Sequence, residues 1–189
     1  MAVGLGFPGR GGRWFRTQST TLHLLGSALG GAAAGILLAL IGGAASLDDH
    51  RAIVVATATV LGLFFSLRRR PTKLGLQVQV PRTWRYTMLP QVRYVLWGIL
   101  LGSGIATLIP YPIYLVLFGA ELTVGVPVAA VAGALFGVAR ELPVVLPLVL
   151  DYREDETFRL FGRLHPAVRR LNLVLTALIG TLLVLATLG

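Results

Sequence analysis

The segment TLHLLGSALGGAAAGILLALIGGAAS, Thr21–Ser46, contains no Asp, Glu, Lys or Arg. The uncharged stretch around it runs from Thr17 to Leu47. A helix of about 20 apolar residues spans the roughly 30 Å hydrocarbon core of a bilayer. This segment therefore predicts a transmembrane helix and, with it, an integral membrane protein.

Further stretches without Asp, Glu, Lys or Arg follow this segment along the chain. They are Ala52–Leu67, Tyr94–Ala120, Leu122–Ala139 and Leu171–Gly189. Only 13% of the 189 residues are charged, whereas about a quarter of the residues of a soluble domain are charged. We predict an all-α fold, a polytopic transmembrane helical bundle of about five spans. The spans are expected at about 21–46, 52–67, 94–118, 123–139 and 171–188 of a single transmembrane domain, 21–189.

The basic residues fall in alternate gaps between these spans. Some lie in the N-terminal tail, residues 1–20, which we expect to be flexible and basic. The gap between the second and third spans has no acid and holds Arg68, Arg69, Arg70, Lys73, Arg82, Arg85 and Arg93. Cytoplasmic loops of membrane proteins carry excess Lys and Arg. The pattern predicts cytoplasmic loops at about 68–93 and 140–170, with the N-terminus inside and the C-terminus outside.

Composition also suggests where the protein resides. Lys73 is the single lysine among 17 basic residues, and Ala, Gly, Val and Leu are abundant, which is typical of GC-rich bacterial coding. We expect a multi-pass protein of the bacterial plasma (inner) membrane. In an alternative interpretation the first segment is a signal peptide cleaved near Ala44–Ser46. Its apolar run of about 25 residues exceeds the 7–15 of a signal peptide, which favours a retained span.

Small residues recur at every fourth position of the first span. The series is Ser27, Gly31, Gly35, Ala39 and Gly43, and the fourth span continues it with Ala129, Gly133 and Gly137. Such stripes let two helix backbones approach closely, and close packing drives helix association in lipid. We expect the glycines of both stripes at helix contacts. The contact is either between spans of one chain or between two copies.

Glu121, Arg140 and Glu141 are the only charges between Tyr94 and Leu150. An ionisable side chain at membrane depth is costly and marks a functional site when it is buried. We therefore predict a candidate intramembrane polar site at these three residues. The alternatives are an outer-surface loop position for Glu121 and an inner-surface anchor position for Arg140 and Glu141.

A helix break is expected at Pro110 and Pro112, because proline removes a backbone donor and clashes with the preceding turn. If the chain then dips back into the bilayer, Glu121 could line a polar cavity. Irregular backbone is tolerated at that depth only when it lines a cavity or is buried in protein. Whether residues 110–120 re-enter the membrane is left open by the sequence.

A short amphipathic helix is predicted on the inner surface before the last span. It would begin at Asp151, in a capping-box pattern with Glu154, and end at Pro166. Its apolar face would consist of Phe158, Phe161 and Leu164. The apolar stretch Leu142–Leu150 before it either extends the fourth span or lies at the interface.

Several classes of chemistry are excluded or disfavoured. The chain has no cysteine, which excludes disulfides, thiolate metal sites and thiol redox chemistry. The neighbouring Asp48, Asp49 and His50 could bind a cation, but three adjacent side chains in a short turn rarely converge on one ion. No Ser–His–Asp spacing and no P-loop lysine is present. We expect no metal, no cofactor and no nucleic-acid partner. An intramembrane enzyme is disfavoured, because no acid–base or nucleophile set is visible, but it is left open.

Two functions remain. The first is a small transport-related membrane domain or a membrane subunit of a larger complex, and five spans are few for a transporter, so a homo- or hetero-oligomer is expected. The second is a non-catalytic scaffold that binds anionic lipid or a cytoplasmic partner through an Arg-rich inner face. This face would consist of Arg68, Arg69, Arg70, Arg82 and Arg85.

Overall fold

A computed structural model describes residues 13–68, 83–104, 113–149 and 154–188, and every regular element in these ranges is a helix. Four helices of the described chain are long and apolar enough to cross a membrane. Their candidate spans are Thr17–Ala44, Leu47–Leu67, Val126–Pro143 and Gly162–Thr187. The protein is therefore all-helical, and the length and apolar character of these four helices are those of an integral membrane protein.

The first two helices are joined by a short turn. Helix α1, Arg13–Ala44, is 32 residues long, and it begins within the stretch expected to be a flexible tail. A short 3₁₀ turn, η1 (Leu47–His50), leads into α2, Arg51–Leu67. Ser46 before the turn has a φ of 52°, a left-handed conformation that reverses the chain direction.

The predicted third span, 94–118, is not one helix. After the single turn α3 (Trp84–Thr87), helix α4 runs from Pro90 to Gly102, and helix α5 covers only Ile113–Glu121. The 13 residues of α4 and the 9 of α5 are each too short to cross a bilayer alone, at about 1.5 Å per residue. The prolines to which the break was attributed, Pro110 and Pro112, lie outside the described residues.

Gly104 explains why helix α4 does not continue. Gly104 has a φ of 69°, a left-handed conformation that glycine adopts without steric cost. A side chain at Gly104 would also collide with the rings of Phe136 and Phe118. Glycine is therefore required here both by the backbone and by the packing of α4 against the next helices.

The remaining helices are longer than predicted. Helix α6, Val126–Val149, passes through Arg140 and Glu141, so residues 142–149 continue the same helix, beyond the candidate span that ends at Pro143. Helix α7 is one helix from Glu154 to Leu188 and contains Pro166 in its interior.

The prediction that a separate amphipathic helix ends at Pro166 was therefore wrong. Proline leaves the carbonyl four residues earlier without its helical donor. Here that residue is Gly162, which is exposed, and no atom lies within 4 Å of where its Cβ would stand. Because this position is exposed, the carbonyl that lacks its helical donor is not buried without a partner.

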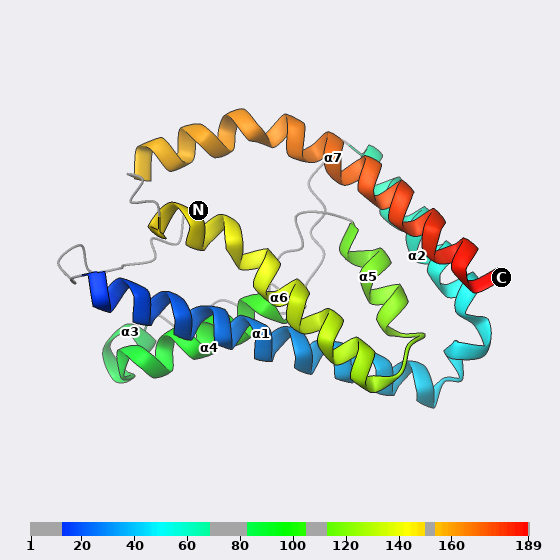
Figure 1. Ribbon diagram of the computed structural model, residues 1–189, viewed down its shortest axis with the longest axis horizontal. Coiled ribbons are helices and arrows are strands. Elements are labelled where there is room, and N and C mark those ends of the chain that lie inside the picture. Colours follow the sequence, from blue (N-terminus) through cyan, green and yellow to red (C-terminus); the bar gives the residue numbers. More distant parts are fainter. Residues whose placement is uncertain (1–12, 69–82, 105–112, 150–153, 189) are drawn as a thin grey trace.

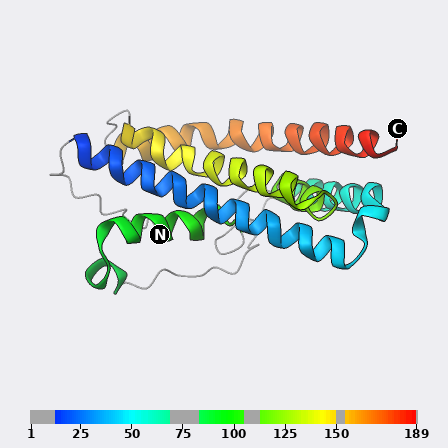
Figure 2. The same ribbon diagram turned by 60° about the horizontal axis from the view of Figure 1, so that its bottom comes forward.

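The helices pack as two groups. Helix α1 packs against α6 and α4, whereas α2 packs against α7 and α5. In Figures 1 and 2, α1 and α7 begin at the same end of the molecule and α6 runs in the opposite direction between them. The two halves of the predicted third span thus belong to different groups, α4 to the first and α5 to the second.

The outer surface and the interior have opposite character. The buried apolar residues are mostly small, as Ala34, Ala39 and Ala129 illustrate, and they are accompanied by buried Ser, Thr, His and Glu side chains. Large apolar side chains lie outside, a distribution expected when lipid is the solvent. They include Leu25, Leu29, Leu37, Leu40, Ile53, Val60, Val131, Leu135, Val174, Leu178, Leu182 and Leu185.

Candidate functional site

The most extensive helix contact lies between α1 and α6. The position that a Cβ of Gly31 would occupy is filled by the carbonyl oxygen of Gly133, and the reverse holds for Gly133. One turn away along each helix, Gly35 lies against the carbonyl of Ala129, and Gly137 against the carbonyl of Ser27. The two helices therefore meet in antiparallel register, in steps of four residues, with backbone against backbone.

Helix α4 approaches α1 from another side by the same means. Gly26 and Gly30 of α1 lie against backbone atoms of Val95 and Ile99 of α4. From α4, Gly98 lies against the carbonyl of His23, and Gly102 against the carbonyl of Ser27. Helix α1 is thus held between two helices at backbone distance, which only glycine permits.

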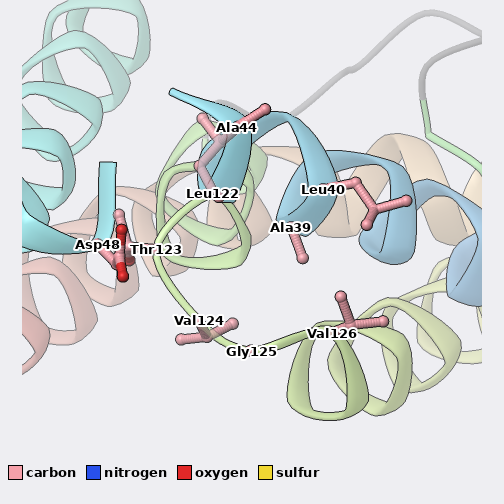
Figure 3. A pocket seen from close by; sticks show the side chains of 10 residues that line it. Ala39, Leu40, Ala44, Asp48, Leu122, Thr123, Val124, Gly125 and Val126 are labelled. Atoms are coloured by element: carbon pink, nitrogen blue, oxygen red, sulfur yellow. The ribbon is translucent and has the colours of Figure 1, made fainter. Parts of the chain in front are cut away.

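Gly43, at the end of the small-residue series in α1, is placed differently. It is exposed, and no atom lies within 4 Å of where its Cβ would be. Instead it lines a pocket of about 340 Å³ between the end of α1, the η1 turn and the turn that joins α5 to α6 (Figure 3). Asp48 and Thr123 are the residues with polar side chains in its lining.

A buried acid–base pair occupies the next step of the α1–α6 register. His23 Nε2 lies 2.9 Å from Glu141 Oε2, and the two side chains are 3% and 2% exposed. The other ring nitrogen, Nδ1, lies 3.3 Å from the carbonyl oxygen of Tyr94 in α4. The pair therefore joins all three helices of the first group.

Arg140, beside Glu141 in sequence, faces another helix. Its guanidinium carbon lies 5.8 Å from the ring centre of Tyr114 in α5. That ring packs edge-to-face on Phe136, with centres 4.6 Å apart. Arg140 is thus part of the contact between α5 and α6, whereas Glu141 is part of the contact between α6 and α1.

Glu121 is the second fully buried carboxyl group. Its side chain is 2% exposed, and its Oε1 atom has no hydrogen-bond partner in the described part of the chain. It ends α5, and Gly119 on the same helix lies against Ala58 of α2. The structure therefore places Glu121 inside the protein, as the polar-site hypothesis requires, and not in an exposed loop.

The three charges predicted as one site are separated. Glu141 pairs with His23, Arg140 lies over Tyr114, and no ion pair joins Glu121 to another described residue. The sequence around His23 does not indicate a partner, because that partner lies 118 positions away. One feature of the sequence could have indicated the pair. His23 lies four residues before Ser27 on one small-residue stripe, and Glu141 lies four residues after Gly137 on the other.

A second polar contact, between α2 and α7, was also missed. Asn172 donates from Nδ2 to Ser66 Oγ at 3.3 Å, and Gly180 lies against the Thr59 side chain. At the end of α2, Arg169 Nη2 donates to the carbonyl oxygen of Arg68 at 3.1 Å. These contacts could have been indicated by the polar and small residues that recur with helical spacing inside the apolar spans. The pattern of charges does not include such residues.

The predicted Arg-rich face can be placed only in part. Arg68 is exposed at the end of α2. Arg69, Arg70 and Arg82 lie outside the described residues, and Arg85 belongs to α3 without a described side chain. In the described ranges, no three His, Asp or Glu side chains converge in a way that could hold a metal ion.

The arrangement combines one buried carboxyl group without a partner among the described residues, one buried His–Glu pair and an interrupted span. Comparison with protein-family models, with curated proteins and with solved structures finds no match to this chain.

Proposed function

We propose that this chain is a small transport-related membrane domain, acting alone or as the membrane subunit of a larger complex, and that Glu121 is its ion-binding carboxylate. The observation that carries the proposal is the burial of Glu121, at 2% exposure, with Oε1 lacking a hydrogen-bond partner among the described residues. The ion would be a proton or a small cation, because either one neutralises a buried carboxylate.

Burial of the Glu121 carboxyl group is energetically costly. A buried polar group without a partner costs roughly 1–3 kcal/mol, and more when it is charged. A purely structural helix end has no need of a carboxylate at this position. A buried acid of this cost is expected to bind an ion reversibly, because ionisable residues within membrane domains commonly mark ion pathways.

The interrupted span supports the same proposal. Discontinuous helices form binding sites in many transporters, where their ends and the irregular backbone between them face the substrate. Here α4 ends at Gly102 against α1, and α5 carries Glu121 at its far end while packing on α2. A movement of one helix group relative to the other would act directly on the connection between α4 and α5.

The proposed arrangement in the membrane follows from counting α4 and α5 together as one crossing. The chain then crosses five times, with the N-terminus inside and the C-terminus outside, in a bacterial inner membrane. With so few crossings, a homo- or hetero-oligomer is the expected working form.

Ion flux into proteoliposomes tests the role of Glu121. Purified protein is reconstituted in vesicles that contain a pH-sensitive dye, and the internal pH is followed after a membrane potential is imposed. The wild-type protein should accelerate proton entry, or Na⁺ entry when a Na⁺ dye is used. Glu121→Gln should abolish this flux, whereas Asp49→Asn, which removes an exposed carboxylate, should retain it. Equal flux in wild type and Glu121→Gln would reject the site.

A second candidate function is supported by the first half of α7. Four of its arginines are exposed, and each basic residue near an anionic membrane surface contributes about 1 kcal/mol of binding. They are Arg159, Arg163, Arg169 and Arg170. As a scaffold for anionic lipid or an acidic partner, the protein would lose binding when these arginines are reversed in charge, while Glu121 would be dispensable. Native mass spectrometry of bound lipid, with membrane orientation checked in parallel, separates the two functions.

A further inference from the structure

The α1–α6 contact carries a feature that close packing does not require. At three successive steps of its register, small residues face small residues or backbone: Gly35 with Ala129, Gly31 with Gly133, and Ser27 with Gly137. At the fourth step, His23 faces Glu141. Another pair of small residues would have continued the contact, so the two ionisable side chains call for a separate explanation.

The number of protons in this pair follows from its contacts. The carbonyl oxygen of Tyr94 can only accept a hydrogen bond, so His23 Nδ1, at 3.3 Å, carries a proton. The 2.9 Å contact between Nε2 and Glu141 Oε2 then needs one further proton between them. That proton resides on the ring, giving an ion pair, or on the carboxyl group, giving a neutral pair. In both cases the net charge of the pair is zero.

Gain or loss of a proton would leave an uncompensated charge in the closed contact. With one proton more, the pair is a cation, and with one proton fewer, Nε2 presents a lone pair to a carboxylate. The side chains are 3% and 2% exposed, so water cannot stabilise either state while the helices remain in contact. A single buried charge of this kind is strongly unfavourable.

Among the neighbouring charged groups, Arg140 attracts Glu141 electrostatically, which favours the state in which Glu141 carries the negative charge. On α4, Arg93 lies over the Tyr94 ring at 5.4 Å, and on α6, Arg140 lies over Tyr114 of α5. Helix α5 also carries Glu121, which makes no ion pair with a described residue. Among the side chains of α1 that the structure describes, His23 is the only ionisable one. The proton shared by His23 and Glu141 is therefore held beside the positive charge of Arg140.

We propose that His23 and Glu141 form a binding site for one proton, and that this site exchanges its proton only when the α1–α6 contact opens at that end. The ligand is the proton itself, and the site is distinct from Glu121. The proposal does not depend on the ion-binding role of Glu121, and it would hold for a subunit that carries no ion by itself. Proton binding and helix separation become one linked equilibrium.

Spin-label distance measurements on the full chain in nanodiscs test this linkage. The chain has no cysteine, so labels can be placed at will. One pair, Leu25→Cys with Leu142→Cys, lies near the proton site, and a control pair, Leu40→Cys with Val128→Cys, lies at the other end of the same two helices. The four positions are comparably exposed, at 55%, 50%, 56% and 59%.

Distances are recorded between about pH 5 and about pH 8, where an ordinary histidine changes its charge. The pair near the site should gain a population at longer distance at one end of this range, while the control pair stays unchanged. Glu141→Gln and His23→Gln should each lose the pH response. Constant distances in the wild type, or the same pH response in both variants, would overturn the proposal.

Nitrogen NMR keeps the proposal testable if these variants do not fold. In [¹⁵N]histidine-labelled wild type, His23 should keep a protonated Nδ1 and show an Nε2 signal intermediate between protonated and free nitrogen. His50 and His165 are exposed and serve as internal references for solvent-accessible rings. If His23 titrates as they do, the pair does not hold a proton in the closed contact.

Discussion

Gly31 of α1 and Gly133 of α6 face each other so closely that the carbonyl oxygen of each occupies the place where a Cβ of the other would stand. This reciprocal contact lies in the middle of the α1–α6 register. Close approach of two backbones also permits Cα–H···O contacts, which contribute a fraction of a kcal/mol each. The contact fixes α1 relative to α6 and thereby sets the distance between His23 and Glu141 two turns away.

Alanine at Gly31 or Gly133 should therefore lower stability. The added methyl group meets backbone, which cannot move aside as a flexible side chain can, so we expect a loss of about 1–3 kcal/mol. Gly43→Ala is the matched control, because it changes the same residue type on the same helix in open space. Reversible unfolding in mixed micelles measures the difference. Equal stability of the Gly31→Ala and Gly43→Ala variants would contradict the contact.

The two buried glutamates should respond in opposite ways to the same substitution. Glu141→Met removes the partner of His23 and leaves a buried ring nitrogen unsatisfied, so stability should fall by about 1–3 kcal/mol. Glu121→Met removes a carboxyl oxygen without a partner in the described chain, so stability should stay equal or rise. Both residues are 2% exposed, which makes the comparison a matched one. Equal losses at both positions would show that Glu121 has a structural partner.

The membrane helices could be predicted from the sequence because lipid imposes a simple requirement on them. Each crossing needs a long apolar stretch, and the four candidate spanning helices overlap four of the predicted spans, although the last begins at Gly162 and not at 171. The ends of the helices were predicted least well, because they depend on backbone conformation and not on composition. The left-handed Gly104 ends α4 inside an apolar stretch, and α7 continues through Pro166.

The candidate site could be predicted only as a set of residue types. Glu121 and Glu141 were recognised because a charge within an apolar stretch is costly and visible in one sequence. Their surroundings depend on contacts between helices, which a single sequence does not contain. The partner of Glu141 is His23, 118 positions earlier, and Arg140 turns to Tyr114 because adjacent helix positions differ by about 100° in direction.

Arg169 should hold the end of α2 in place. It donates to the carbonyl oxygen of Arg68 at 3.1 Å, a group that the end of the helix would otherwise leave to water. Because this contact is exposed, we expect Arg169→Ala to cost roughly 1 kcal/mol or less and to raise amide exchange near Leu67 and Arg68 up to about fivefold. Arg170→Ala removes the same charge from the neighbouring exposed position. Identical exchange in both variants would show that the contact contributes nothing.

The count of membrane crossings can be decided by single cysteines, because the natural chain contains none. Thr87 precedes α4 and Gly125 follows α5, and both positions are exposed. If α4 and α5 together make one crossing, Thr87→Cys and Gly125→Cys lie on opposite sides of the membrane. A maleimide that does not cross membranes should then label Gly125→Cys in intact cells and Thr87→Cys only after permeabilisation.

The opposite result would change the whole topology, because the described helices other than α4 and α5 supply four candidate spans. With four crossings, Thr87 and Gly125 would share a side, and the two ends of the chain would lie on the same side of the membrane. Ser46→Cys, in the exposed turn after α1, then serves as the outside reference in both cases. Labelling of Ser46→Cys and Gly125→Cys but not of Thr87→Cys in intact cells is expected only when the two short helices complete a fifth crossing, with Glu121 near its outer end.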